Sequence, residues 1–165
     1  MSREGLSIDL ERCIGCKSCE VACKQEHGLG PAERRNQVLW LTDANAAPSL
    51  RFLTLACQHC ERPACLRACP ASPKAISKDP ATGRVEIDEA RCVGCGECVV
   101  ACPYGAMGYD PVDHHAVKCD LCVDRRRAGQ PDTACAAVCP GKAIRFGERD
   151  TLLRSAEADG RTLVD

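Results

Sequence analysis

The chain has few aromatic side chains and no long apolar segment. Only 3% of its 165 residues are aromatic: one Trp, two Tyr and two Phe. Large aromatic side chains usually supply much of the buried area of a protein core, so we expect something other than side chains to fill part of the interior. No stretch approaches the roughly 18 apolar residues of a membrane span. The sequence therefore predicts no transmembrane helix.

Strong net charge and the features of an export signal are also absent. The formal net charge is −1, which excludes the strongly basic footprint of a nucleic-acid-binding protein. The segment MSREGLSIDLER is charged and has no apolar run, so it is not typical of a signal peptide. The arginines at 34–35 and 125–127 do not precede an apolar segment, as a twin-arginine signal would. We expect a cytoplasmic protein with reduced thiols; a chain exported together with a signal-bearing partner would show the same pattern.

Cysteine is the residue that the chain has in excess. Its sixteen cysteines fall into four groups of four with none left over. The first and third groups are spaced C-x2-C-x2-C-x3-C, the second x2, x4, x3, and the fourth x2, x12, x3. The last three groups continue similarly, as CPASPKAI, CPYGAM and CPGKAI, which indicates an internal repeat. In chain order the groups are Cys13, Cys16, Cys19 and Cys23; Cys57, Cys60, Cys65 and Cys69; Cys92, Cys95, Cys98 and Cys102; and Cys119, Cys122, Cys135 and Cys139.

The C-x2-C-x2-C-x3-C spacing is the bacterial ferredoxin signature, in which the fourth cysteine ligates a neighbouring iron–sulfur cluster. Three thiolates at i, i+3 and i+6 of a tight loop can each bind one iron of a cubane. Gly15, Gly94 and Gly96 let the loop adopt unusual backbone angles and approach the cluster closely. The x3 step predicts a short helix within CEVACKQEH and within CVVACP. The sequence therefore predicts 4Fe–4S clusters.

Zinc and disulfides are the alternative explanations of clustered cysteines. Zinc ribbons place two C-x-x-C pairs about 15–20 residues apart, and only the fourth group approaches that spacing. Two complete ferredoxin runs and two variants ending in Cys-Pro do not fit zinc, and disulfides need an oxidising compartment. Metal analysis separates the cases, because four clusters require about sixteen irons and sixteen sulfides per chain. A zinc-stapled interaction module would contain zinc without sulfide.

Short strands are predicted between the groups, because the residues alternate there as strands do. Two hairpins are expected, one turning near Asp79-Pro80 and the other near Asp110-Pro111; they span residues 75–88 and 106–118. LSIDL before the first group and AIRF after the fourth are expected to pair. The insertion at 24–56 contains two predicted strands, QVLWL and RFLTL.

Several side chains allow two interpretations. We expect His59 to be a loop residue near a cluster rather than a ligand, and His114 and His115 to be solvated in a hairpin turn. Trp40 is expected to pack over a cluster, with a place on an electron route as the alternative. The arginines at 125–127 indicate either a docking patch or a solvated loop.

The four groups, in this order and with an unbroken third group, resemble the four-cluster iron–sulfur subunits of the dimethyl sulfoxide reductase type. These subunits accompany molybdenum or tungsten oxidoreductases such as formate dehydrogenases, polysulfide reductases and aldehyde oxidoreductases. CIGCKSCEVACKQEHG and ACQHCERPACLRACP are similar to that family, and the resemblance covers roughly residues 5–148. It implies an α+β fold of two interleaved ferredoxin-like dicluster units, with short antiparallel hairpins and short helices around four clusters. We expect one compact domain over 1–150 and a tail at 151–165, either a short helix or a docking segment.

The resemblance also implies which cysteines share a cluster. It combines the first group with the fourth and the second with the third, and the complete third group implies four 4Fe–4S clusters. The implied ligand sets are Cys13, Cys16, Cys19 and Cys139 (first set); Cys23, Cys119, Cys122 and Cys135 (second set); Cys57, Cys60, Cys65 and Cys102 (third set); and Cys69, Cys92, Cys95 and Cys98 (fourth set).

The function that the resemblance implies is electron transfer without a substrate site of its own. The chain would relay electrons between a catalytic subunit, holding a molybdenum or tungsten pterin and oxidising an aldehyde or formate, and a second redox partner, either a flavin subunit or a soluble carrier. The alternatives are a free-standing polyferredoxin and an accessory protein of enzyme maturation. Self-association through the tail or the insertion is a further hypothesis.

Overall fold

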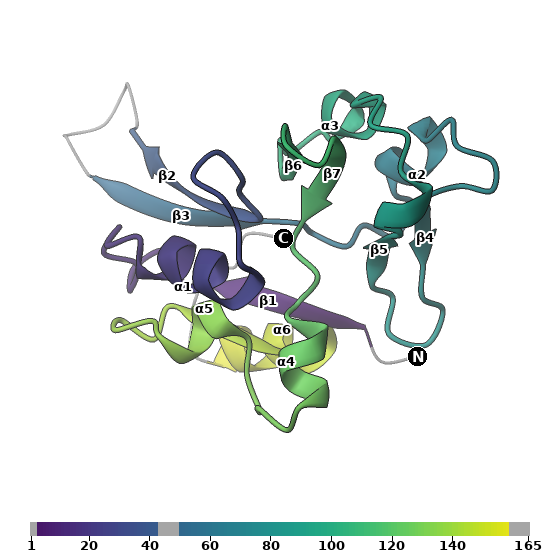
Figure 1. Cartoon of the computed structure of the whole chain (residues 1–165). Coiled ribbons are helices and arrows are strands. Elements are labelled where there is room, and N and C mark those ends of the chain that lie inside the picture. Colours follow the sequence, from purple (N-terminus) through teal and green to yellow (C-terminus); the bar gives the residue numbers. More distant parts are fainter. Residues whose placement is uncertain (1–2, 43–49, 159–165) are drawn as a thin grey trace.

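The computed structural model describes residues 3–42 and 50–158. Within them the chain forms four two-stranded antiparallel sheets and six α-helices, most of them short (Figure 1). This mixture confirms the predicted α+β class. In chain order the elements are β1 (Glu4–Ile8), α1 (Ser18–His27), β2 (Asn36–Leu41), β3 (Arg51–Ala56), α2 (Ala64–Ala68), β4 (Ile76–Lys78), β5 (Val85–Ile87), a 3-10 turn (Glu89–Arg91), α3 (Glu97–Ala101), β6 (Met107–Asp110), β7 (His115–Lys118), α4 (Val123–Arg127), α5 (Ala134–Ala137), β8 (Ile144–Glu148) and α6 (Arg149–Ala158).

Both predicted hairpins are confirmed. β4 pairs with β5, and the Asp79 carboxylate closes their turn by accepting from the Thr82 hydroxyl and the Ala81 N–H. β6 pairs with β7, and the Asp110 carboxylate accepts from the N–H groups of Val112 and Asp113. An aspartate that binds backbone N–H groups two or three residues ahead stabilises a tight turn.

The strands near the two ends of the described chain pair with each other, as predicted. β1 and β8 are antiparallel, with Leu6 opposite Phe146 and Ile8 opposite Ile144. Helix α6 packs against both strands and buries Ala156. The first part of the expected tail is thus a helix on this sheet, whereas residues 159–165 lie outside the described residues and the docking role of the tail stays a prediction.

The insertion contains the two predicted strands, and they form a third hairpin. β2 and β3 are antiparallel, with Trp40 opposite Phe52. Val38 and Thr54 are buried where the hairpin faces the rest of the molecule. The loop between these strands, residues 43–49, lies outside the described residues.

The helices that follow the cysteine loops pack in two pairs. Helix α1 of the first group packs against α5 of the fourth, and α2 of the second group against α3 of the third. Figure 1 shows α2, α3 and the β4–β5 and β6–β7 hairpins on one side, and α1, α4, α5 and α6 with β1 on the other. We call these two parts the nested half and the outer half, because the nested half is contributed by the middle of the chain.

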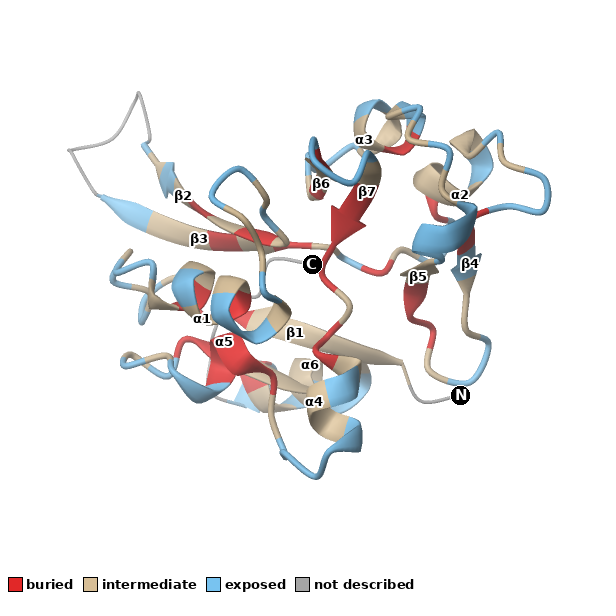
Figure 2. Cartoon of the chain, in the orientation of Figure 1, coloured by how far each residue is buried: buried red, intermediate tan, exposed pale blue. Residues whose placement is uncertain are grey.

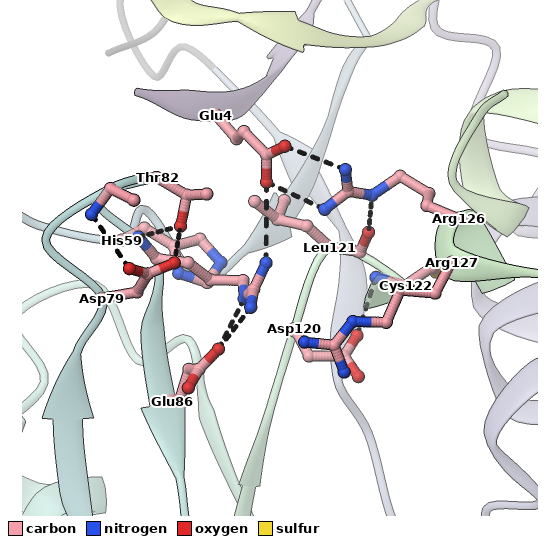
Figure 3. Close-up of polar contacts among 12 residues, drawn as sticks. Glu4, His59, Asp79, Thr82, Glu86, Asp120, Leu121, Cys122, Arg126 and Arg127 are labelled. Carbon is pink, nitrogen blue, oxygen red and sulfur yellow. Dashed lines mark hydrogen bonds and ion pairs between the residues drawn. The ribbon is translucent and has the colours of Figure 1, made fainter. Parts of the chain in front are cut away.

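A contact around Glu4 connects the two halves. The Glu4 carboxylate on β1 accepts two hydrogen bonds from Arg126 of α4, at 2.9 and 2.8 Å (Figure 3). Its Oε2 also lies 3.7 Å from Nη1 of Arg84, a buried residue beside β5. Arg126 stacks over the Phe146 ring at 4.4 Å. One carboxylate therefore bridges cations from both halves.

The buried apolar residues form small clusters that include thiols rather than one broad core (Figure 2). One cluster in the outer half combines Ile8, Val38 and Ile144 with Cys19 and Cys135. The cluster in the nested half combines Ile76, Val85 and Met107 with Cys98. No helix in 3–42 or 50–158 is long and apolar enough to span a membrane.

Candidate metal centres

The four C-x-x-C loops share one backbone feature. The residue before the second cysteine has a positive φ in every loop: Gly15 (+68°), His59 (+45°), Gly94 (+69°) and Leu121 (+60°). This conformation places the N–H groups of His59 and Leu121 3.5 and 3.4 Å from the sulfurs of Cys57 and Cys119. Only the glycines indicated this geometry in the sequence, since His59 and Leu121 adopt a conformation that L-residues rarely take.

The two glycines are required by close packing as well as by φ. A Cβ at Gly15 would lie 2.4 Å from the Phe52 ring, and a Cβ at Gly94 would lie 2.4 Å from the carbonyl oxygen of His114. Carbon and oxygen atoms cannot approach that closely, so any larger residue would displace the loop. The loops are therefore packed directly against neighbouring elements.

A second repeated feature follows two of the Cys-Pro steps. The N–H groups of Ala106 and Ala143 lie 3.4 and 3.3 Å from the sulfurs of Cys102 and Cys139. Near Cys69 burial acts to raise the thiol pKa, but the backbone N–H groups of Ala71, Ala75 and Ile76 outweigh it, and the pKa of Cys69 is lowered. The segments that follow the three Cys-Pro steps thus direct N–H groups at Cys69, Cys102 and Cys139, the last cysteines of the second, third and fourth groups, which stabilises a thiolate there.

The four thiols of the first set line one cavity. Cys13, Cys16, Cys19 and Cys139 surround it together with apolar residues that include Val38 and Ile144. Thr54 Oγ1 lies 3.6 Å from the Cys19 sulfur, and Ser18 Oγ lies 3.4 Å from the Cys16 sulfur. The first and fourth groups therefore meet at a single cavity.

The second-set thiols are all buried and influence one another. Burial, with the charges of Cys122 and Cys135 adding to it, raises the pKa of Cys23 to about 12. Burial likewise raises the pKa of Cys135 to about 11. Cys119 is fully buried, and its pKa is raised first by burial and then by Cys135. The structure thus brings these four cysteines together from α1, α4, α5 and the loop after β7.

The third-set thiols also lie close together. Burial raises the pKa of both Cys60 and Cys65, and for each of them Cys57 and Cys102 act in the same direction. These residues come from the second-group loop, the start of α2 and the end of α3. The second group therefore lies close to the last cysteine of the third group.

In the fourth set, burial raises the pKa of Cys98 to about 11, and Cys92 and Cys95 add to the effect. Cys69 packs in the same apolar cluster as Cys98 and Cys92. Three thiols of one ferredoxin loop and one from the neighbouring group therefore lie in one region of the nested half.

These groupings fit iron–sulfur clusters chemically. Each contains four sulfur donors, and burial opposes the ionisation of most of them. Thiolates packed this closely repel one another unless a bound cation neutralises them, and a bound metal deprotonates its thiol ligands. The N–H and hydroxyl groups around the thiols are the donors that such sulfurs accept from. The assignment of each cysteine to a particular cluster remains our proposal.

The structure changes the interpretation of several side chains. Arg125 and Arg126 belong to helix α4 and pair with Glu26 and Glu4, so the solvated-loop interpretation was wrong for them. Arg127 is exposed and pairs across one helical turn with Asp124.

Two further expectations concern His115 and Trp40. His115 lies on β7 with its side chain only 13% exposed, and Nε2 is 3.6 Å from the Glu89 carboxylate, so its solvated placement was wrong. His114 is exposed, as expected. Trp40 is exposed, and its ring meets the Phe52 ring edge-on with centroids 5.7 Å apart. Its place on an electron route stays a prediction.

The repeated loops, the paired helices and the all-sulfur donor sets define an iron–sulfur protein of the bacterial ferredoxin type. Comparison with known families supports this class. Residues 48–149 match the family described as a 4Fe-4S dicluster domain, and residues 4–25 match a 4Fe-4S binding domain. The cofactors of this protein are 4Fe–4S clusters.

Curated relatives identify the family more narrowly. The thiosulfate reductase electron transfer subunit of Salmonella typhi is 38% identical over 86% of this sequence and 74% of its own length. A subunit of the anaerobic dimethyl sulfoxide reductase of Escherichia coli is 38% identical over 90% of this sequence and 75% of its own length. The formate dehydrogenase iron-sulfur subunit of Haemophilus influenzae is 36% identical over 91% of this sequence and 53% of its own length. The protein belongs to the family of iron–sulfur subunits that includes these relatives, which confirms the resemblance.

Proposed function

We propose that this chain is the electron-transfer subunit of an oxidoreductase and relays electrons through four 4Fe–4S clusters, held by the four cysteine sets, between a catalytic subunit and a second redox partner. Its relatives are named as the electron transfer subunit of thiosulfate reductase, a subunit of dimethyl sulfoxide reductase and the iron–sulfur subunit of formate dehydrogenase. When bound, the clusters supply reversible one-electron chemistry. The chain's own residues hold them in order and stabilise their charge.

The observation that carries the proposal is the order in which the sets adjoin. Cys19 of the first set and Cys135 of the second are buried in one apolar cluster. Cys57 of the third set packs against the cluster that contains Cys119 of the second, and Cys65 of the third packs against the cluster that contains Cys98 of the fourth. Because each proposed set adjoins the next, the sets would form one series from first to fourth. Such a series is what a relay by electron tunnelling requires.

The exposed ligand thiols lie at the two ends of this series. Cys16 belongs to the first set and Cys95 to the fourth, and these two are the exposed cysteines, whereas all four second-set thiols are buried. The neighbouring side chains Ile14 and Val93 are exposed apolar residues. Electrons would therefore enter beside one of these loops and leave beside the other, and partner proteins would dock over them.

The identity of the partners is a finer part of the proposal. We propose a catalytic subunit that holds a molybdenum or tungsten pterin and oxidises an aldehyde or formate. The second partner would be a flavin subunit or a soluble carrier, and the compartment would be the cytoplasm.

Self-association through residues 151–165 or the 24–56 insertion is a secondary proposal, which light scattering of the holo-protein with residues 159–165 removed would test.

Anaerobic affinity purification from the native host tests the function. We expect a stoichiometric catalytic subunit containing molybdenum or tungsten, with about sixteen irons and sixteen sulfides per copy of this chain. Cell fractionation in the same experiment gives the compartment. A chain that purifies alone with its clusters intact would indicate a free-standing polyferredoxin, and zinc without sulfide would exclude the relay.

A further inference from the structure

His59 is a deeply buried side chain that retains one unused hydrogen-bond donor. It lies in the second-group loop and is 3% exposed. Its Nδ1 accepts a hydrogen bond of 2.9 Å from the N–H of Val85. A ring nitrogen that accepts carries no proton, so the proton of the neutral imidazole is on Nε2. Nε2 is buried and has no hydrogen-bond partner within 3–42 and 50–158.

Two cations, Lys118 and Arg84, are the charged groups that act on His59. Both cations are themselves buried: the Lys118 ammonium donates to the carbonyl of Cys119, and Arg84 pairs with Glu86. Neither offers an acceptor to Nε2, because both carry only donors.

The position of His59 is the junction between the two middle sets. His59 follows Cys57 of the third set by two residues, and Lys118 precedes Cys119 of the second set. Cys119 and Leu121 belong to one buried apolar cluster, and Cys57 packs against it. The unused donor is thus buried where an electron would pass between the outer and nested halves.

A buried donor without an acceptor is unfavourable, and native proteins rarely keep one. The chain's own atoms do not supply the acceptor in its described part, but the sulfurs of a bound iron–sulfur cluster accept hydrogen bonds, and such bonds help to set the reduction potential. The other three C-x-x-C loops have Gly15, Gly94 and Leu121 at the equivalent position. The side-chain donor is therefore specific to the second-group loop.

We propose that the Nε2–H of His59 donates a hydrogen bond to a sulfur of one of the two clusters that meet at this junction, and that it raises the reduction potential of that cluster. His59 is thus a positioning residue and not an iron ligand. A hydrogen bond to sulfur is stronger when the cluster carries one more negative charge, so the bond favours the reduced form. This inference rests on the proposed ligand sets.

Two substitutions of His59 test the roles of the two ring nitrogens separately. In His59→Asn the amide oxygen is placed to keep the bond from Val85, and asparagine tolerates the positive φ, but the Nε2 donor is lost. In His59→Gln the longer side chain returns an N–H donor near the position of Nε2 and loses the acceptor for Val85. The midpoint potentials of all clusters are measured in the holo-complex by redox titration monitored by electron paramagnetic resonance.

We expect one potential to shift to a more negative value in His59→Asn and to return toward the native value in His59→Gln. Unchanged potentials in His59→Asn, or an equal shift in both variants, would overturn the inference. Iron content and the number of titrating clusters are measured in the same samples. A native protein without four clusters would contradict the proposed function, whereas four clusters with unshifted potentials would contradict only the role of His59.

A second measurement leaves His59 in place. The chain has four histidines, so replacing His27, His114 and His115 by Asn makes His59 the sole histidine. With histidine labelled with ¹⁵N in the imidazole ring alone, which leaves out the His59 backbone N–H near the Cys57 sulfur, we expect a hyperfine coupling between the reduced cluster and one ring nitrogen. The absence of this coupling would overturn the inference even if the His59 variants fail to assemble.

Discussion

Hydroxyl groups lie against two of the buried thiols. Thr133 Oγ1 is 3.3 Å from the Cys135 sulfur, and Thr54 Oγ1 is 3.6 Å from the Cys19 sulfur. Both threonines are almost completely buried. A buried hydroxyl beside a metal-bound thiolate can donate to it and reduce the cost of adding an electron. These residues therefore act on the sulfurs although they bind no iron.

We predict that Thr133→Val lowers the reduction potential of the cluster to which Cys135 contributes. Losing one hydrogen bond removes about 1 kcal/mol of preference for the reduced state, which corresponds to about 40 mV for a one-electron couple. Thr133→Ser keeps the hydroxyl and should retain the native potential. Redox titration of both variants checks this. An equal shift in the two would contradict the role assigned to the hydroxyl, because Thr133→Ser retains it.

At the residue scale, the sequence was informative about the cysteines and poor about what surrounds them. The cysteine spacing identified every thiol and, with the two loop glycines, the positive φ at Gly15 and Gly94. It gave no indication of the same backbone conformation at Leu121, because a leucine carries no preference for it. Nor did it predict the burial of His59, which depends on β5 lying against the second-group loop.

The cysteine loops are the elements in which geometry is most tightly constrained. Gly94 has φ +69°, and a Cβ at this position would collide with the carbonyl oxygen of His114 in the β6–β7 hairpin. Gly96, two residues later, has φ +76°, but among the described residues no atom lies within 4 Å of where its Cβ would be. The two positions therefore share a positive φ and differ in packing.

We predict that Gly94→Ala prevents normal assembly of the cluster held by the fourth set, whereas Gly96→Ala is tolerated. Alanine at positive φ costs about 1–2 kcal/mol at either site, but only at Gly94 must the loop also move away from a carbonyl oxygen. Iron analysis should show the loss of about four irons per chain in Gly94→Ala. Equal iron content in the two variants would contradict the role assigned to packing.

At the element scale, the hairpins and the helices α1 and α3 after the two ferredoxin runs were predictable, whereas α4 was not. The turns at Asp79-Pro80 and Asp110-Pro111 have local signals, and both formed where expected. Helix α4 was missed: it spans five residues, Val123–Arg127, too few to show a helical periodicity. From the sequence its arginines were interpreted as part of a solvated loop, because their partners Glu26 and Glu4 lie about a hundred residues away along the chain.

At the scale of the whole molecule, one carboxylate contacts both halves. Glu4 contacts Arg126 from the outer half and approaches Arg84 from the nested half, and all three side chains are largely removed from solvent. Removing one partner of a buried ion pair is costly because the remaining charge stays buried. These electrostatic contacts therefore help to hold the two halves together.

We predict that Glu4→Gln lowers the free energy of unfolding by about 2 kcal/mol and the apparent Tm of the holo-protein by about 5 °C. The control is Asp124→Asn, which removes an exposed pair with Arg127 on α4 and should change stability by less than about 1 kcal/mol. Anaerobic calorimetry gives both values, and equal effects would show that the Glu4 contact does not join the halves.

We also predict that removing iron unfolds the chain. The apolar clusters are small and contain the thiols themselves, so the bound cofactors complete the core and metal binding drives folding. Far-UV circular dichroism of protein freed of iron and sulfide should show loss of native secondary structure, with recovery on reconstitution. Native-like spectra of the iron-free chain would mean that the side chains alone suffice.

The order of the cysteines along the chain has a consequence for synthesis. All thiols of the third and fourth sets lie in the segment from Cys57 to Cys102. The first set is complete only after Cys139, which precedes β8, has been synthesised. During translation the clusters of the third and fourth sets can be assembled while β1 still lacks its partner strand β8. Pairing of β1 with β8 is then the final step. A chain released early would hold the third and fourth clusters but would lack the first and second, to which they pass electrons in the proposed relay.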